Sequence, residues 1–312
     1  KYPWNGCERV YDSVCPVQPR WECPVKPTDL TQRASWMMPI AWLLLTCGLA
    51  QGQTPTIVQP QLGQQGKDLV WVPSPQAVVE AMLDLAGATP HDRVIDLGSG
   101  DGVVVIGAAK RGSRAHGIEY NPDLVELSRR NAAAAGVGDK ATFEEADLFE
   151  SDFSKATIIT MFLLPSLNLR LRPRILALEP GTRVVSNTYD MGDWKPDKTA
   201  IVPGCATAEL LSGIFEWRWC TALLWIVPAK IEGSWRFPQG ELTLEQQFQV
   251  VSGALGSGGS AVPISHGRLR GDRLSFTAAN VEYEGRVTGD TIEGTLTADG
   301  QTSNFRATRA GR

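Results

Sequence analysis

Histidine and cysteine, which serve many enzymes as nucleophiles, bases and metal ligands, are scarce in this chain. Only three histidines and six cysteines occur among its 312 residues. The histidines His91, His116 and His266 are scattered, so no Ser-His-Asp or Cys-His set can be assembled around them. No cysteine or histidine cluster has the spacing of a metal site. We therefore expect no metal.

The chain also lacks a strong excess of charge. Its formal net charge is −4, whereas nucleic-acid-binding domains usually carry a basic surface. We therefore expect no nucleic-acid partner. No pattern in the sequence indicates an oligomeric state.

No apolar run has the ordinary length of a membrane-spanning helix. Residues 37–50 are apolar but number only fourteen, against the roughly 20 that a bilayer requires. This segment resembles the apolar core and cleavage region of a secretory signal. If it functions as one, the protein is exported to the periplasm or associates with a membrane through it; if not, the protein is cytoplasmic. Residues 1–36 are expected to be a non-native or disordered upstream segment, and residues 51–68 a linker.

The most informative stretch is residues 94–102, with the sequence V-I-D-L-G-S-G-D-G. It predicts a strand that runs into a tight turn at Gly98, Gly100 and Gly102, followed by a helix over residues 103–111. A dinucleotide-binding turn has the spacing G-x-G-x-x-G, which differs from the spacing here. An acid at Asp96 would also repel a pyrophosphate but could bind a cationic ammonium group. A nucleotide-dependent oxidoreductase is therefore the weaker alternative.

Strands and helices alternate after this turn. We predict strands at 114–120, 140–147, 156–165 and 182–189, and helices at 121–135 and 166–178. This alternation predicts an α/β fold, a parallel sheet wrapped by helices. Ligands of such sheets bind at the carboxyl ends of the strands, where Asp96, Glu119, Asp147 and Pro165 fall.

Asp96 and the three glycines resemble the first motif of the class I S-adenosylmethionine (SAM) methyltransferases. The resemblance implies a Rossmann-like seven-stranded sheet, closed by an antiparallel pair at 210–219 and 221–227, and SAM as the cofactor. It also implies that Glu119 binds the ribose hydroxyls and Asp147 the adenine amine. The expected cofactor-binding residues are Pro73, Asp96, Gly98, Ser99, Gly100, Gly102, Glu119, Tyr120, Asp147, Leu148, Leu164 and Pro165.

A narrower resemblance covers about residues 69–194. The runs at 71–83, 96–102 and 162–173 are similar to the lysine methyltransferases that modify the ATP synthase c-subunit and the adenine nucleotide translocase. This likeness implies a protein substrate, a segment at Val72, Pro73 and Ser74 folded over SAM, and a Leu164-Pro165 pair bordering the methyl group. Trp71 departs from the family, which usually has tyrosine there, and the 190–194 loop is not a general methyltransferase feature.

Methyl transfer from a sulfonium is an in-line displacement that needs no covalent enzyme intermediate, so positioning and desolvation suffice. A lysine acceptor must also lose a proton, and Asn168, Asp190 and Asp193 are the weak catalytic candidates. Each also fits an ordinary helix-start or loop position. The alternative function is a non-catalytic protein of the cell envelope that uses a SAM-type fold for binding.

Arg170, Arg172 and Arg174 alternate along the predicted 166–178 helix. A solvated helix face is the favoured interpretation, with an anionic substrate or a membrane surface as the other possibility.

The composition changes near residue 228, which divides a methyltransferase domain (69–228) from a C-terminal β-meander domain (229–312). Glycines and threonines become frequent, and residues 267–275 and 285–293 repeat a Gly-Asp turn between alternating strands at a spacing of eighteen. We predict a small sandwich or open barrel, which either binds a partner or stabilises the enzyme. Cys205 and Cys220 either form a disulfide or remain two buried thiols.

Overall fold

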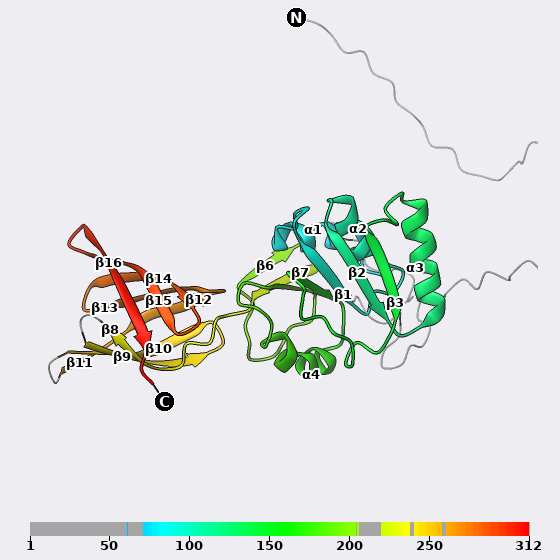
Figure 1. The fold of residues 1–312 in the computed structure, drawn as a ribbon. Helices are drawn as coiled ribbons and strands as arrows, with labels where there is room; N and C mark the ends of the chain where they lie inside the picture. The colour runs from blue at the N-terminus through cyan, green and yellow to red at the C-terminus, as the bar shows by residue number, and fades with distance from the viewer. Residues whose placement is uncertain are drawn as a thin grey trace, which may run out of the picture. The chain divides into compact units, whose positions relative to one another are not determined.

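The glycine turn follows an inner strand of a seven-stranded sheet. The computed structural model describes residues 61, 71–203, 205, 220–237, 240–257 and 260–311. The strands are β1 (Arg93–Leu97), β2 (Arg114–Glu119), β3 (Ala141–Glu145), β4 (Ile158–Met161), β5 (Arg183–Asn187), β6 (Lys198–Ile201) and β7 (Thr221–Ile226). They lie in the order β3-β2-β1-β4-β5-β7-β6 (Figure 1). The first five are parallel and β7 is antiparallel to β5 and β6, which confirms the predicted Rossmann-like sheet.

Helices cover both faces of this sheet. They are α1 (Gln76–Ala86), α2 (Val103–Lys110), α3 (Pro122–Ala134) and α4 (Pro165–Ile175). Neighbouring residues of β1 point to opposite faces: Val94 packs in a core cluster with α1, α2 and α3, and Ile95 in a second cluster with α4. Both faces of the central strands are therefore buried, which explains their nearly continuous apolar sequence.

Helix α1 was not among the elements predicted from sequence, although its signals are present. Val78, Val79, Met82 and Leu83 are fully buried and recur at helical spacing. The helix ends at Gly87, whose φ of 61° places it in the left-handed region typical of a glycine C-cap.

The edge of the sheet differs from the expectation. The predicted strand at 210–219 lies outside the described residues, and the structure pairs β7 with β6, which was not predicted. Strand β4 is also shorter than predicted, because the chain leaves the sheet after Met161. Cys205 and Cys220 form a disulfide across the connection between β6 and β7.

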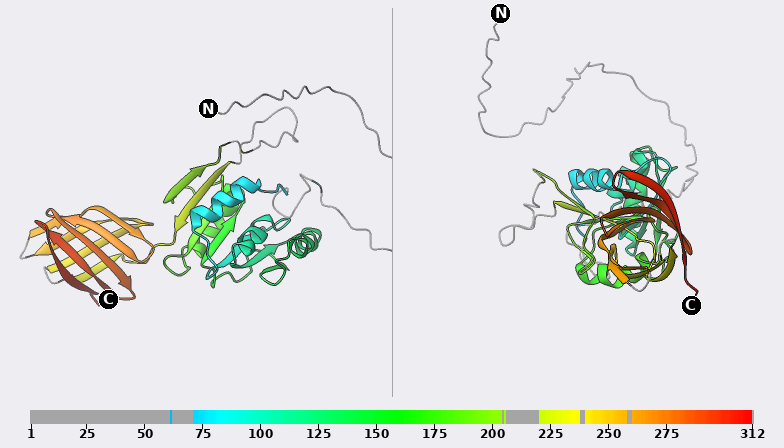
Figure 2. Two further views of the ribbon diagram at one scale, coloured as in Figure 1. Left: turned by 90° about the horizontal axis from the view of Figure 1, so that it is seen from above. Right: turned by 90° about the vertical axis from the view of Figure 1, so that its left-hand side faces the viewer.

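A second sheet, which is antiparallel throughout, begins after β7. Its strands are β8 (Gly233–Phe237), β9 (Gly240–Gln247), β10 (Val250–Ser257), β11 (Ser260–Pro263), β12 (Ser265–Arg270), β13 (Arg273–Ala278), β14 (Val281–Thr288), β15 (Thr291–Ala298) and β16 (Gln301–Arg309). Strand β9 pairs with both β8 and β10, which closes the sheet on itself (Figure 2). The predicted antiparallel β domain is therefore confirmed. Its form differs from the expected sandwich or open barrel, because the meander closes.

The repeated Gly-Asp pairs form the turns of this barrel. Gly271 and Asp272 connect β12 to β13, and Gly289 and Asp290 connect β14 to β15. The interior is filled by side chains, because Phe237, Phe276, Tyr283 and Phe305 pack ring against ring. The repeat pattern in the sequence did not predict this aromatic core, because its residues come from four different strands.

The remaining predictions for the N-terminus concern residues that the structure largely does not describe. The upstream segment (1–36), the signal-like segment (37–50) and most of the linker (51–68) lie outside the described residues. Among the helices that are described, none combines the length and hydrophobicity needed to cross a membrane.

Candidate active site

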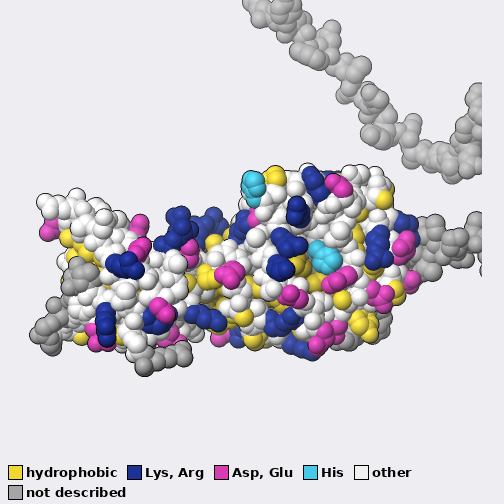
Figure 3. Space-filling model, viewed as in Figure 1, with side chains coloured by type: hydrophobic (Ala, Val, Ile, Leu, Met, Phe, Trp, Pro, Cys, Tyr) yellow, Lys and Arg dark blue, Asp and Glu magenta, His cyan; other side chains and the backbone are white. Residues whose placement is uncertain are grey.

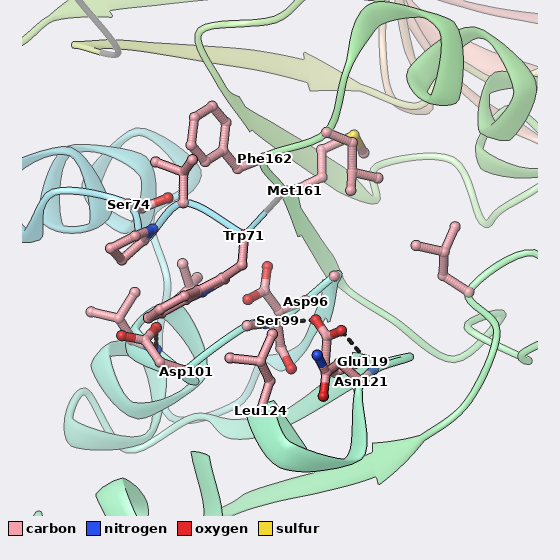
Figure 4. Close-up of a pocket in the computed structure, with 18 of the residues that line it drawn as sticks. Trp71, Ser74, Asp96, Ser99, Asp101, Glu119, Asn121, Leu124, Met161 and Phe162 are labelled. Atoms are coloured by element: carbon pink, nitrogen blue, oxygen red, sulfur yellow. Dashed lines mark hydrogen bonds between the residues drawn. The ribbon is translucent and has the colours of Figure 1, made fainter. Parts of the chain in front are cut away.

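A pocket opens at the carboxyl ends of β1, β2 and β4, on the glycine turn (Figure 4). Its lining residues are Trp71, Val72, Pro73, Ser74, Met82, Asp96, Gly98, Ser99, Gly100, Asp101, Val103, Val104, Glu119, Tyr120, Asn121, Leu124, Asp147, Leu148, Met161, Phe162, Leu163 and Leu167. The strands deliver these residues to one place because parallel neighbours end at the same edge of the sheet.

The turn brings backbone and acid together. The amide of Gly100 donates to Glu119 Oε2 at 2.9 Å, and the amide of Asn121 donates to Glu119 Oε1 at 2.9 Å. Each carboxylate oxygen has a further lone pair. Glu119 is therefore fixed in position and still able to accept hydrogen bonds from two hydroxyls of a ligand.

Asp96 lies at the base of the pocket and is almost fully buried. The hydroxyl of Thr160, on the neighbouring strand β4, donates to Asp96 Oδ1 at 2.7 Å. Burial raises the pKa of Asp96 to about 7, and the nearby carboxylates of Glu119 and Asp101 raise it further against the opposing effect of Thr160. A cation in the pocket would relieve this cost of ionisation.

The charge of the pocket decides which class of ligand fits. Four carboxyl groups line it, from Asp96, Asp101, Glu119 and Asp147, whereas no lysine, arginine or histidine is among the described lining residues. A pyrophosphate would meet repulsion here, while a sulfonium and an ammonium would be attracted. The hydroxyl of Ser99 is buried without a hydrogen-bond partner among the described residues. The site therefore fits SAM.

Most of the predicted cofactor-binding residues line this pocket. The exceptions are Gly102, Leu164 and Pro165. Gly102 has φ of 82°, and a Cβ on it would lie 2.8 Å from the ring of Phe143. Gly102 is therefore needed for close packing against Phe143 and does not line the pocket. Residues Phe162 and Leu163 line the pocket in place of the Leu164-Pro165 pair, whose contact with the methyl group stays a prediction.

Several lining residues were missed by the sequence reasoning. Trp71 lies against Gly100: a Cβ added to Gly100 would lie 2.7 Å from the indole nitrogen. Asn121 and Leu124 belong to the start of α3, the helix that follows the Glu119 strand. The amphipathic first turn of that helix was a usable signal, whereas the contact of Trp71 depends on a segment distant in sequence.

The three weak catalytic candidates do not line the pocket. Asn168 is fully buried, and its side-chain amide donates to the carbonyls of Tyr189 and Asp190 at 3.2 and 3.1 Å. Asp190 is exposed and accepts from the Gly192 amide at 3.1 Å. Asp193 is exposed and pairs with Arg172, whose hydrogen bond lowers the pKa of Asp193. Through these contacts each of the three residues stabilises the loop after β5.

The arginines of α4 hold loops rather than forming a purely solvated face. Arg174 donates to the carbonyls of Leu148, Phe149 and Ser151, with the Ser151 contact at 2.5 Å. Arg172 donates to the carbonyl of Met191 at 2.8 Å. Arg170 lies over the ring of Phe149, 3.6 Å from its centroid. Elsewhere on the face in Figure 3, basic and acidic side chains are interspersed.

Comparison with known proteins places this site in a family. Residues 96–198 match the ANTKMT methyltransferase domain. A protein-lysine N-methyltransferase of Saccharolobus islandicus is 40% identical over 129 residues, which cover 40% of this chain and 80% of that protein. The lysine N-methyltransferase of the ATP synthase c-subunit from Mus musculus is 34% identical over 194 residues, covering 59% of this chain and 76% of that protein.

The chain belongs to the protein-lysine N-methyltransferase family. It is a SAM-dependent methyltransferase, as the acidic pocket and the resemblance predict. A solved structure described as an RNA methyltransferase from Salinibacter ruber with S-adenosyl-L-homocysteine is 45% identical and covers 51% of this chain and 96% of that one, at a TM-score of 0.45. In the present chain, the match to the ANTKMT methyltransferase domain ends at residue 198, before β7 and the barrel strands.

Proposed function

We propose that this methyltransferase transfers a methyl group to the side-chain amine of a lysine in a protein substrate. The observation that carries the proposal is the similarity to the Saccharolobus islandicus protein-lysine N-methyltransferase, of which the chain covers 80%. The acidic pocket supports it, because it suits the cationic cofactor that such a transfer requires.

The residues of the pocket have separate tasks in this proposal. Asp96 binds the cofactor ammonium, Glu119 accepts hydrogen bonds from the ribose hydroxyls, and the loop at Asp147 and Leu148 borders the adenine. SAM supplies an electrophilic methyl group on a sulfonium. The transfer is in line: the lysine nitrogen forms a bond to the methyl carbon as the sulfur–carbon bond breaks, and the bonding pair stays on sulfur.

The chain contributes to this step mainly by positioning and by excluding water. The buried side chains of Met161 and Leu163 form an apolar part of the lining. A neutral amine enters such a surface more easily than an ammonium, which favours the nucleophilic form. Pre-arranged geometry of this kind can account for much of the rate of a group transfer.

The proposal is tested by incubating a lysate of the source organism with the enzyme and SAM carrying an isotope-labelled methyl group. We expect label in protease-sensitive material, and methyl-lysine after acid hydrolysis. The Asp96→Ala variant, added in equal amount, controls for endogenous activity. Label confined to ribonuclease-sensitive material, or to an amino acid other than lysine, would contradict the lysine assignment; no label above this control would favour the non-catalytic alternative.

We further propose that the methyltransferase is exported or membrane-associated through residues 37–50. The disulfide between Cys205 and Cys220 supports an oxidising compartment. Fusing a reporter that is active only in the periplasm to the C-terminus tests this, and activity confined to a cytoplasmic reporter would reverse the conclusion.

A further inference from the structure

We propose that Phe162 and Tyr189 form an aromatic wall along which the acceptor lysine reaches the cofactor pocket, and that the wall favours a cationic nitrogen. This inference rests on the proposed lysine acceptor. Phe162 lines the pocket directly after strand β4. Tyr189 follows strand β5, the parallel neighbour of β4. The two rings are nearly parallel, with centroids 6.0 Å apart and planes inclined by 17°.

The wall has one end in the pocket and the other at the surface. Figure 4 shows Phe162 on the side of the pocket opposite Glu119 and Asn121. Tyr189 is not a lining residue, and both rings are partly exposed. Tyr189 therefore extends the aromatic surface outward from Phe162. A ring face is electron-rich and attracts a cation, so Phe162 and Tyr189 can do this on the side of the pocket away from Glu119.

The backbone at Tyr189 is fixed by side-chain hydrogen bonds, although the loop is partly exposed. Its carbonyl accepts from the hydroxyl of Ser186 at 2.7 Å and from the side-chain amide of Asn168 at 3.2 Å. Ser186 and Asn168 are fully buried. Two buried side chains thus fix the backbone that carries the ring after the strand.

Strain at the preceding residue strengthens the argument. Thr188 is β-branched and has φ of 62°, a region that such residues rarely adopt. Its hydroxyl donates to Asn187 Oδ1 at 2.9 Å, and Asn187 in turn donates to the hydroxyl of Ser74 in the pocket wall at 3.2 Å. Backbone strain that the surroundings maintain is concentrated at functional sites. Here it turns Tyr189 toward Phe162.

The aromatic wall can stabilise the charge that develops on the lysine nitrogen during methyl transfer. During transfer the positive charge passes from sulfur to the lysine nitrogen, so the nitrogen gains charge as the new bond forms. An aromatic face close to that nitrogen stabilises the developing charge more than the neutral amine. A cation over an aromatic ring gains affinity by about 3- to 30-fold, which is the size of effect to be measured.

The test uses analogues of S-adenosylhomocysteine in which nitrogen replaces the sulfur and carries an arm along the path of the lysine. One analogue has a 2-(butylamino)ethyl arm, a second the 2-butoxyethyl arm of the same shape, and a third only a methyl group. Titration calorimetry with the full-length protein gives the ratio of amine-arm to ether-arm affinity. We expect about 3- to 30-fold for the natural protein, a smaller ratio for Tyr189→Leu and Phe162→Leu, and a retained ratio for Tyr189→Phe.

Phe149→Leu is the matched control, because it removes a partly exposed ring from a different loop and should keep the ratio. A ratio near one in the natural protein, or an unchanged ratio in both leucine variants, overturns the proposed wall. Binding of the methyl analogue shows that each variant is folded and has a working cofactor site. If the natural protein fails to bind that analogue, the proposed function itself falls.

Discussion

The amide of Gly100 donates to Glu119 Oε2 at 2.9 Å, so the glycine turn after β1 and the acid that ends β2 form one unit. Nineteen positions separate them in sequence. The bond fixes the carboxylate at the pocket and leaves lone pairs for a ligand. The contact explains why a short turn and a distant acid have to be considered together when a cofactor site is predicted.

Protonation of Asp96 should weaken cofactor binding. Its pKa is raised to about 7 by burial, and only the ionised form attracts the cofactor ammonium. We expect the affinity for SAM to be roughly 30-fold lower at pH 5.5 than at pH 8, as follows from a pKa near 7. Calorimetry in buffers of different ionisation enthalpy should also detect proton release on binding below pH 7. Affinity independent of pH in this range would contradict the role of Asp96.

The same group should lower the stability of the ligand-free protein. Because the folded pKa of about 7 lies above the ordinary value of 3.8, the folded state keeps the proton longer, and stability falls as pH rises from about 4 to 7. Asp96→Asn should therefore be more stable than the natural protein at pH 8, by at most about 4 kcal/mol, and equal to it near pH 4. Urea unfolding at both values measures this; greater stability of the natural protein at pH 8 would refute it.

Gly102→Ala should destabilise the fold although Gly102 does not line the pocket. The new Cβ would lie 2.8 Å from Phe143 and 2.9 Å from Ser128, at φ of 82°. Left-handed strain and overpacking together cost about 2–4 kcal/mol. Gly136→Ala is the control, because its φ is also positive at 69° but no atom lies within 4 Å of the added Cβ. Equal losses in urea unfolding would show that packing at Gly102 is unimportant.

Arg174 should act on cofactor affinity through the loop that it holds. Its guanidinium donates to the carbonyls of Leu148, Phe149 and Ser151, and a lysine cannot reach all three. We expect Arg174→Lys to weaken S-adenosylhomocysteine binding by about 3- to 10-fold, from the loss of one or two hydrogen bonds. Arg172→Lys, on the same helix, should leave the affinity unchanged, because Arg172 contacts Met191 and Asp193 in a different loop. If both variants bind alike in calorimetry, the loop does not depend on Arg174.

The disulfide should contribute measurably to stability. Cys205 and Cys220 are separated by 15 residues, and closing a loop of that length is worth about 3 kcal/mol in the chain-entropy account. We expect the double variant Cys205→Ser, Cys220→Ser to melt at a lower temperature than the natural protein. Reductant should lower the melting temperature of the natural protein alone. Identical melting curves for the two proteins under oxidising conditions would show that the bond does not form.

The central part of the fold was predictable because its signals are local. Gly98 to Gly102 require a turn, the strands before and after are apolar, and the Asn121-Pro122 pair begins a helix, with the Asn121 side chain accepting from the Asp123 amide at 2.9 Å. The β6–β7 pairing was not predictable, because β6 (Lys198–Ile201) is short and mostly exposed. Closure of the barrel depends on a pairing between β9 and β10 together with seven further strand pairings around the ring, and no single hairpin reveals it.

The sequence by itself determined the cofactor class, the parallel sheet and the two Gly-Asp hairpins, since each follows from residue types at short spacing. Only the tertiary structure decided that Trp71 lies on Gly100, that Arg174 holds the Asp147 loop, and that Tyr189 faces Phe162. These contacts join segments that are distant in sequence and meet only when the sheet is assembled. Local propensity cannot specify them, because the energy of each contact depends on the packing of both partners.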